Sequence, residues 1–185
     1  MPLVQYQGRK NPTVYPPHVG GLFYCSPIPT VFTTFIVTAN ILYASPFYVP
    51  ALTTYISIVL EVTGLISSTT ARMAIYNDSA GMPDTIVAST DIGTVSTAST
   101  GAKTNVIAVA LNPGWYWLAS CYSGAPTVRA LSQTNALPVL GFTSTTDVTL
   151  HVGVSVAFTY AALPSPFTGG AVLATTALPR ILVGV

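Results

Sequence analysis

The sequence predicts an all-β protein: an antiparallel β-sandwich or jelly roll with an extended arm at each end. Segments rich in Val, Ile, Thr, Tyr and Phe follow one another from Thr30 to Tyr160, and these residue types are enriched in strands. Clusters of Gly, Pro, Asn and Ser separate the segments at the short intervals typical of sandwiches. Apolar residues do not recur with the period of a helix over any stretch long enough to form one.

The predicted strands belong to one domain, residues 30–160. In chain order, the clearest are TVFTTFIVT (30–38), TTYISIVLEV (53–62), TARMAIY (70–76), TNVIAVAL (104–111), WYWLASCY (115–122) and DVTLHVGVSVAF (147–158). In the fourth and the last of these, apolar β-branched residues recur at every second place, which directs one face of a strand to a core. The segments predicted as loops are NDSAGMPD (77–84), STASTGAK (96–103), LNPGW (111–115) and YSGAP (122–126).

The two ends of the chain differ from this domain. Residues 1–29 combine several prolines with tyrosines, and residues 161–185 mix Pro and Gly with small apolar residues. We predict two extended arms that bind neighbouring subunits.

The composition predicts assembly. Half of the residues are hydrophobic and only 6% are charged, against about a quarter in typical soluble domains. With a net charge of +1, copies repel one another little, and apolar surface is buried most simply against a partner. A membrane partner is not predicted, because polar residues and Pro interrupt every apolar stretch before it reaches the length of a spanning helix. The first residues lack the apolar core of a secretory signal, so we expect synthesis in a cytoplasm.

Two tryptophans follow the Pro113-Gly114 turn. In a strand that begins at Trp115, Trp117 shares a face with Ala119 and Cys121, while Tyr116, Leu118, Ser120 and Tyr122 take the other. Since these companions of Trp117 are residue types found inside proteins, we predict a buried Trp117 and a half-exposed Trp115.

The sequence contains few of the residue types that usually carry catalysis or bind metal ions. With five carboxylates and two histidines, the chain offers no acid–base pair in sequence, so we predict no catalytic, cofactor-binding or metal-binding residue and no enzyme activity. Structural roles are expected for His18 in the N-terminal arm and His151 in a strand. Glu61 is interpreted as outward-facing or paired with Arg; a raised pKa is the alternative.

The remaining polar residues also indicate ordinary roles. Asp78 and Asp84 flank a loop glycine, but without further oxygen ligands they are a weak calcium pattern, and a turn role for Asp78 is favoured. Cys25 and Cys121 are predicted to be free thiols. Arg9 and Lys10 form a basic cluster too small for nucleic-acid binding.

Five segments taken together resemble a β-sandwich domain of bacteriophage virion proteins. They cover about half of the chain and are LYASPFYVP (42–50), TARMAIYNDSAGMPDTIV (70–87), STASTGAK (96–103), LNPGWYWLAS (111–120) and GAPTVRAL (124–131). The pattern is Ala-x-Pro-Phe, then Arg-x-x-Ile-Tyr with a Gly-x-Pro loop, a Thr-Gly turn, and Leu-x-Pro-Gly-x-Tyr-Trp. The resemblance implies a non-enzymatic structural module of a phage particle, with no catalytic residues to carry over.

Coiled-coil heptads and collagen-like repeats are absent from the sequence, which argues against a long fibre. We therefore expect a capsid decoration or cement subunit, located in the virion and assembled in the host cytoplasm. Its expected partners are copies of itself, as a homotrimer by analogy, and the major capsid protein or other virion proteins.

The alternative is a compact tail, baseplate or fibre-tip module that binds a host-surface receptor or carbohydrate. Its loops 77–84, 96–103 and 122–126 would then make the contact, because loops on rigid scaffolds often carry recognition. The candidate side chains, which combine aromatic faces with hydrogen-bonding groups, are Tyr76, Asn77, Asp78, Trp115, Tyr122 and Arg129.

Overall fold

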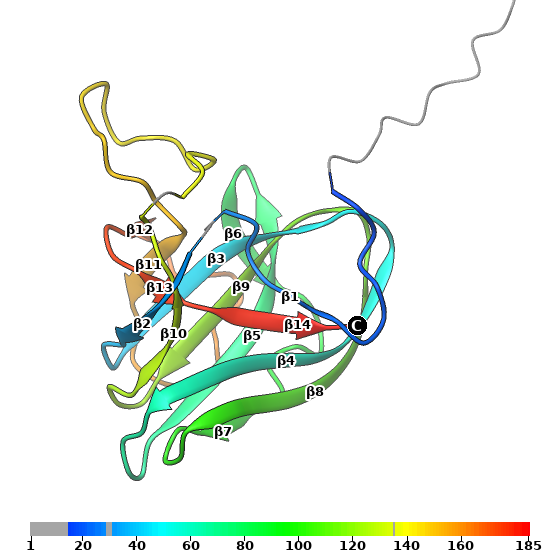
Figure 1. The fold of residues 1–185 in the computed structure, drawn as a ribbon, viewed down its shortest axis with the longest axis vertical. Helices are drawn as coiled ribbons and strands as arrows, with labels where there is room; N and C mark the ends of the chain where they lie inside the picture. Colours follow the sequence, from blue (N-terminus) through cyan, green and yellow to red (C-terminus); the bar gives the residue numbers. More distant parts are fainter. Residues whose placement is uncertain (1–14, 29–30, 135) are drawn as a thin grey trace, which may run out of the picture.

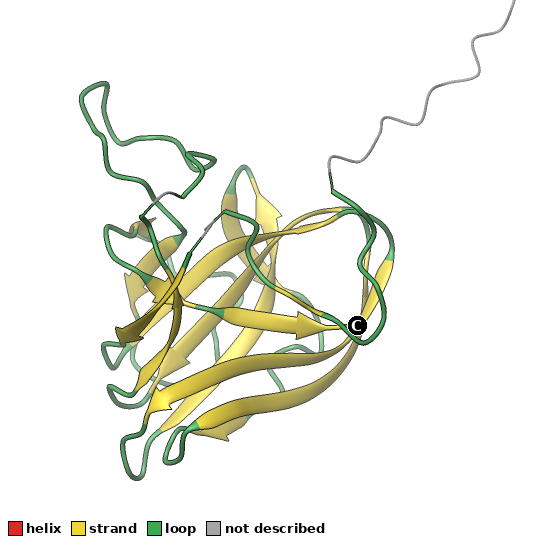
Figure 2. Cartoon of the chain, in the orientation of Figure 1, coloured by secondary structure: helices red, strands yellow, loops and turns green. Residues whose placement is uncertain are grey.

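The structure is a computed structural model that describes residues 15–28, 31–134 and 136–185. In this part of the chain, regular structure consists of strands and contains no helix (Figure 2). The strands form two seven-stranded antiparallel sheets, packed face to face as a sandwich (Figure 1). The predicted fold class is confirmed. No helix in the described ranges is long and apolar enough to cross a membrane.

Sheet A lies nearer the viewer in Figure 1. Its strands are β1 (Phe23–Tyr24), β2 (Phe32–Ile36), β4 (Thr53–Gly64), β8 (Gly101–Leu111), β10 (Thr127–Leu131), β13 (Leu178–Pro179) and β14 (Ile181–Gly184). The long strand β4 pairs with β8 along one edge, and with β14 and β10 along the other.

Sheet B forms the other layer. Its strands are β3 (Ile41–Val49), β5 (Thr70–Ser79), β6 (Met82–Ile86), β7 (Thr94–Ser96), β9 (Gly114–Tyr122), β11 (Val154–Ala157) and β12 (Val172–Leu173). Strand β9 pairs with β3 on one side and β5 on the other. Segments far apart in sequence thus meet at the centre of this sheet.

The described residues form two hydrophobic cores, one on each face of sheet B. The core between the sheets contains Tyr43, Phe47, Ile75, Leu118 and Tyr122 from sheet B, together with Ile58, Leu60, Ile181 and Val183 from sheet A. The second core lies on the outer face of sheet B and contains Leu42, Ala44, Ala74, Tyr76, Trp117, Ala119 and Cys121. Alternate residues of β3, β5 and β9 supply the two cores, because successive strand side chains point to opposite faces.

The prediction for the tryptophan pair is confirmed. Trp117 is 1% exposed and Trp115 is 37% exposed, and the two faces of β9 are divided as predicted. The core that holds Trp117 is the second one, however, and not the one between the sheets.

The strand predicted at 147–158 is largely wrong, because only Val154–Ala157 form a strand. The Asp147 carboxylate accepts hydrogen bonds from the backbone N–H groups of Thr143 (3.0 Å) and Thr149 (2.8 Å). The His151 ring bonds the Ala174 carbonyl through Nδ1 (2.9 Å), so His151 lies in a loop and not mid-strand. Local side-chain to backbone bonds such as those of Asp147 compete with the ladder of a sheet.

The loop predicted at 77–84 is a tight hairpin. Strand β5 runs to Ser79 and β6 begins at Met82, so only Ala80 and Gly81 turn the chain. Both have positive φ angles, 52° and 80°, as expected for the two-residue turns that match the twist of a hairpin.

The prediction that residues 161–185 form an extended arm outside the domain is wrong, because this segment is part of the sandwich. Strand β14 lies within sheet A, between β1 and β4, and Leu163 and Phe167 cover the outer face of sheet B. The alternation of Ile181 and Val183 buries both side chains in the main core. A short apolar strand is hard to recognise among prolines and glycines.

The N-terminal arm is described only from Tyr15 onward, and residues 1–14 lie outside the described residues. In the described part, β1 pairs with β14, and the Gly21 N–H donates to the Val185 carbonyl (2.7 Å). The sandwich therefore includes strands on both sides of the predicted domain 30–160. This part of the arm contacts its own domain.

Candidate functional site

A small hollow opens where β9 begins, beside the β5–β6 hairpin. Its volume is about 190 Å³. The lining residues are Pro46, Asp78, Gly81, Trp115, Trp117, Val139 and Leu140. We call it the Trp115 hollow. The register between β3 and β9 brings part of this lining together, because Pro46 of β3 lies directly opposite Trp117 of β9. The same register sets Tyr48 opposite Trp115, next to the hollow.

The carboxylate of Asp78 is held in place at the edge of this hollow. Its Oδ1 accepts a hydrogen bond from Trp117 Nε1 (2.8 Å), and its Oδ2 accepts one from the Gly81 backbone N–H (3.3 Å). The predicted turn role of Asp78 is confirmed by the second bond. The side chain of Trp117, which is buried, thus holds the exposed carboxylate of Asp78 in one orientation.

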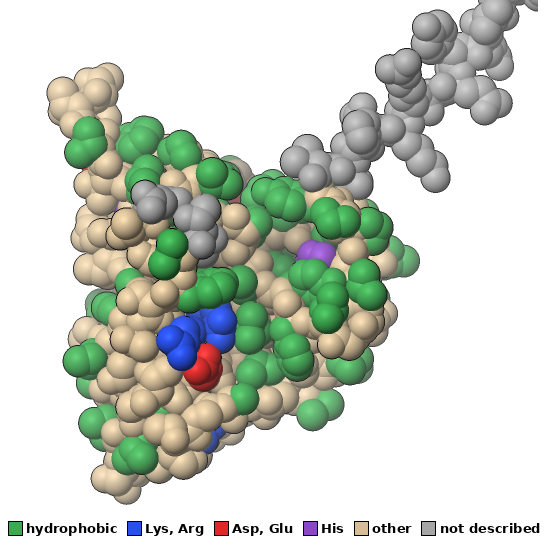
Figure 3. Space-filling view, in the orientation of Figure 1, with side chains coloured by type: hydrophobic (Ala, Val, Ile, Leu, Met, Phe, Trp, Pro, Cys, Tyr) green, Lys and Arg blue, Asp and Glu red, His purple; other side chains and the backbone are tan. Residues whose placement is uncertain are grey.

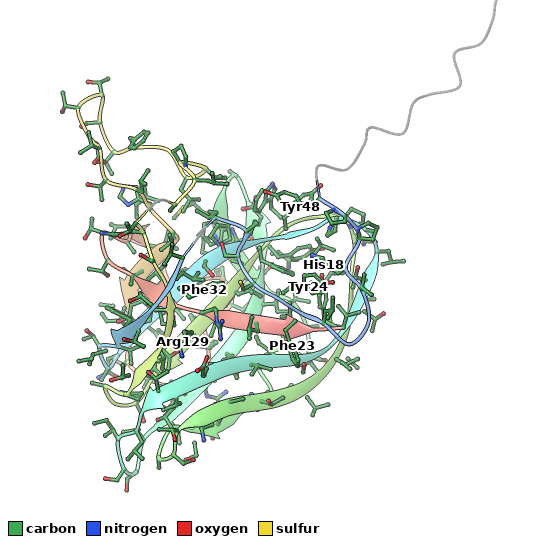
Figure 4. The ribbon with its side chains drawn as sticks, in the orientation of Figure 1. His18, Phe23, Tyr24, Phe32, Tyr48 and Arg129 are labelled. Atoms are coloured by element: carbon green, nitrogen blue, oxygen red, sulfur yellow. The ribbon has the colours of Figure 1, made fainter. Side chains whose placement is uncertain are left out.

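A row of aromatic rings leads away from the hollow. The ring centroids of Trp115 and Tyr48 lie 5.1 Å apart, and those of Tyr48 and Tyr15 lie 5.4 Å apart. Tyr15 and Tyr48 also line a second hollow of about 170 Å³, with Pro16, His18, Tyr24, Cys25 and Pro27. Figure 4 shows Tyr48 near His18 and Tyr24 at this end of the sandwich.

His18 contributes an aromatic wall to the second hollow. Its ring stacks on Tyr24 with centroids 3.7 Å apart, and its Nδ1 lies 2.6 Å from the Tyr55 hydroxyl oxygen. Burial lowers the pKa of His18 below its ordinary value near 6.5, so the ring is neutral at pH 7.

Of the six candidate ligand-binding residues, the structure brings only Asp78 and Trp115 into one hollow. Tyr76 is buried and donates from its hydroxyl to the Pro164 carbonyl (2.7 Å), and Tyr122 lies in the main core. Asn77 donates to the Thr85 side chain across the hairpin (3.0 Å). The sixth, Arg129, lies on sheet A, paired with Glu61.

Tyr48 was not recognised as a site residue from the sequence. In a strand over LYASPFYVP, residues 46 and 48 share one face. Only the register between β3 and β9 shows that this places Tyr48 opposite Trp115.

A second candidate surface is the outer face of sheet A, defined here by exposed apolar side chains on four strands. They are Phe23 of β1 (58% exposed), Phe32 and Ile36 of β2 (47% and 66%), Ile56 of β4 (54%) and Val106 of β8 (76%). Figure 3 shows hydrophobic side chains gathered on this face, with a compact group of Arg and Glu near its centre.

Glu61 sits at the centre of that group. It accepts hydrogen bonds from Arg129 Nε (3.2 Å) and a terminal nitrogen (3.0 Å), and from a terminal nitrogen of Arg180 (2.8 Å). The Arg180 guanidinium also lies 4.9 Å from the Phe32 ring centroid. The Arg129 hydrogen bond is the main cause that holds the pKa of Glu61 below its ordinary value, against the opposing effect of burial. The Arg-paired interpretation is confirmed, and the alternative of a raised pKa is wrong.

We expect the effect of Glu61→Gln to depend on pH. A carboxylate whose pKa is lowered in the folded state stabilises it above the unfolded pKa, near 4.5, and this stabilisation is lost as the pH falls through the folded value. At pH 7 the substitution should cost on the order of 1 kcal/mol or less, since the group is partly solvated. Urea unfolding of both proteins at pH 7 and pH 3 measures this; an equal difference at both pH values contradicts it.

Cys25 and Cys121 are both free thiols, as predicted. In the described ranges, no group of three or more His, Cys, Asp or Glu side chains is placed to hold a metal ion.

Comparison with protein-family models finds no match to the chain, and comparison with curated proteins finds none either.

Proposed function

We propose that this protein is a non-enzymatic structural subunit of a bacteriophage particle, a capsid decoration or cement subunit. It binds copies of itself, and then other virion proteins, through the outer face of sheet A. The observation that carries the proposal is a difference between the two sheets: the described residues cover the outer face of sheet B, whereas on the outer face of sheet A they leave large apolar side chains exposed around the Glu61 group.

The outer face of sheet B is closed by the chain itself. Leu163 and Phe167 complete the second core, and the Phe167 ring packs edge-on against Tyr76 with centroids 5.1 Å apart. On sheet A, the described residues leave Ile36, Ile56 and Val106 more than half exposed. Apolar surface of this extent is typical of an interface.

The size of this face suits a stable contact. Strand β8, with eleven residues, is about 36 Å long at roughly 3.3 Å per residue. Beside it lie β4, then β14 or β10, then β1 or β2, and four strands about 4.8 Å apart have a combined width of about 19 Å. The resulting footprint is on the order of 700 Å², close to the roughly 800 Å² that each partner buries in a standard interface. The low net charge of +1 keeps repulsion between copies small.

The resemblance to phage virion domains supports the part of the proposal that assigns the protein to a phage particle. The segments that carry it lie on β3, on the β5–β6 hairpin, at the β7–β8 turn, and on β9 and β10. Three of these strands, β3, β9 and β5, are direct neighbours in sheet B. The sequence predicted that the C-terminal segment binds neighbouring subunits. Because this segment is part of the sandwich, we assign that binding to the outer face of sheet A instead.

A charge placed on this face should separate the copies. We expect the wild-type protein to form an oligomer, a trimer by analogy, and Val106→Glu to be monomeric, because an unpaired carboxylate in an apolar interface is costly. The matched control is Val148→Glu, since Val148 is 87% exposed in the segment before β11. Light scattering on the purified proteins gives the masses. A monomeric wild type, or an oligomer unaffected by Val106→Glu, contradicts the proposal.

A further inference from the structure

We infer that the Trp115 hollow and the aromatic row beside it form a binding site for a short neutral oligosaccharide. The site joins a half-exposed indole, a fixed carboxylate and two tyrosines, from β9, the β5–β6 hairpin, β3 and the N-terminal segment. Sugar binding at this site is independent of the proposed assembly through sheet A.

The hollow offers the two kinds of contact that a sugar ring uses. A pyranose has a face of C–H groups and a rim of hydroxyls, so it packs on an exposed aromatic ring while its hydroxyls donate to nearby acceptors. Trp115 is 37% exposed, whereas Trp117, two residues further along the same face of β9, is 1% exposed. One indole is therefore available to a ligand, and the other serves to hold Asp78.

Asp78 retains acceptor capacity. An ionised carboxylate has about four acceptor positions, and the described contacts use one on each oxygen, from Trp117 and from Gly81. The side chain is therefore oriented before a ligand arrives, which lowers the entropic cost of binding.

The spacing of the rings indicates more than one sugar unit. The two hollows, about 190 Å³ and 170 Å³, are each smaller than the roughly 300 Å³ at which sites for drug-sized ligands begin. Tyr48 lines the second hollow and packs against Trp115 of the first. A chain of small rings can follow this path, with one unit on Trp115 and the next towards Tyr48 and Tyr15.

Charge favours a neutral ligand. Among the described residues that line the two hollows, none is Lys or Arg, and His18 is neutral at pH 7 because burial lowers its pKa. A phosphate or an acidic sugar would meet Asp78 without a compensating cation. A quaternary ammonium ligand is held by several ring faces around one point. Among the described residues, the second hollow has four such rings but no carboxylate, and the first has the Asp78 carboxylate but the single exposed indole of Trp115, so neither hollow combines both features.

Binding of named oligosaccharides to the full-length protein tests the inference. The probes are chitotriose, cellotriose and maltotriose, with sialyllactose as the acidic comparison and a proline-rich peptide as the alternative ligand of aromatic grooves. Saturation-transfer NMR detects contact, and titration calorimetry measures affinity. We expect at least one neutral trisaccharide to bind.

Substitutions then assign the site. We expect Trp115→Ala to weaken binding about 30-fold, as for an aromatic hot spot, Trp115→Phe to retain part of it, and Asp78→Asn to weaken it about tenfold. The matched control is Phe23→Ala, an exposed aromatic on sheet A, which should leave binding unchanged. Circular dichroism and the thermal midpoint verify that each variant is folded.

Three results would overturn the inference: no binding of any of the neutral trisaccharides, binding that survives Trp115→Ala, or a preference for sialyllactose or the peptide. Among the described residues, the hollow and the outer face of sheet A share no lining residue, so Trp115→Ala should not change the oligomeric mass. Failure of the sugar site is therefore distinguishable from failure of the proposed assembly.

Discussion

Deletion of residues 174–185 is expected to leave the protein unable to fold. The segment contains β13 and β14, and β14 lies in sheet A between β1 and β4. Leu178, Ile181 and Val183 are each no more than 1% exposed, and each buried side chain of this size contributes about 1.5–3 kcal/mol. Together with the lost ladder, this loss is comparable with the whole stability of a domain, about 5–15 kcal/mol.

The measurement is the circular dichroism and urea unfolding of the truncated protein beside the full chain. Ile181→Val serves as the control, because it shortens one buried side chain and keeps the strand; it should cost about 0.5–1.5 kcal/mol. A free C-terminal arm predicts the opposite outcome. A truncated protein with a cooperative unfolding transition would show that the rest of the sandwich is sufficient.

Substitution of Trp117 by Ala is expected to cost about 3–5 kcal/mol of unfolding free energy, the range for removing a large buried aromatic. Trp117 fills the second core with Tyr76, Leu163 and Phe167, and its Nε1 donates to Asp78. Its loss leaves a cavity and frees the carboxylate at the rim of the Trp115 hollow.

Urea denaturation measures this loss, with Trp115→Ala as the control. Because Trp115 is 37% exposed, its substitution should cost about 1 kcal/mol or less. Trp117→Phe should fall between the two variants, since it keeps a ring but loses the donor to Asp78. Equal losses for Trp115→Ala and Trp117→Ala would contradict the assignment of Trp117 to a core.

The strands in the middle of the chain could be predicted because their residue types act locally. The sequences TTYISIVLEV and WYWLASCY became β4 and β9, and the alternation after Gly114 correctly assigned Trp117 to a buried face and Trp115 to the surface. The segment DVTLHVGVSVAF alternates as regularly as these strands, yet only Val154–Ala157 within it form a strand. There, the hydrogen bonds of Asp147 and His151 hold the chain out of the sheet.

The candidate site was only partly predictable for a related reason. Asp78 and Trp115 were recognisable as a carboxylate and an aromatic beside turns. Tyr122 and Arg129 looked equally suitable, but pairing of distant strands places one in the core and the other against Glu61. Tyr48 joined the site because β3 pairs with β9 in the register that sets it opposite Trp115.

The sequence by itself determined the class of fold, the burial of Trp117 and the small number of carboxylates and histidines. These properties follow from residue type and from the two-residue period of a strand. The tertiary structure alone decided that the C-terminal segment enters sheet A, that sheet B carries a core on each face and that Glu61 pairs with Arg129 and Arg180. It also decided that the described residues leave apolar side chains exposed on the outer face of sheet A. The physical reason is that strand partners and their register are set by contacts between residues far apart in the chain, which no local pattern encodes.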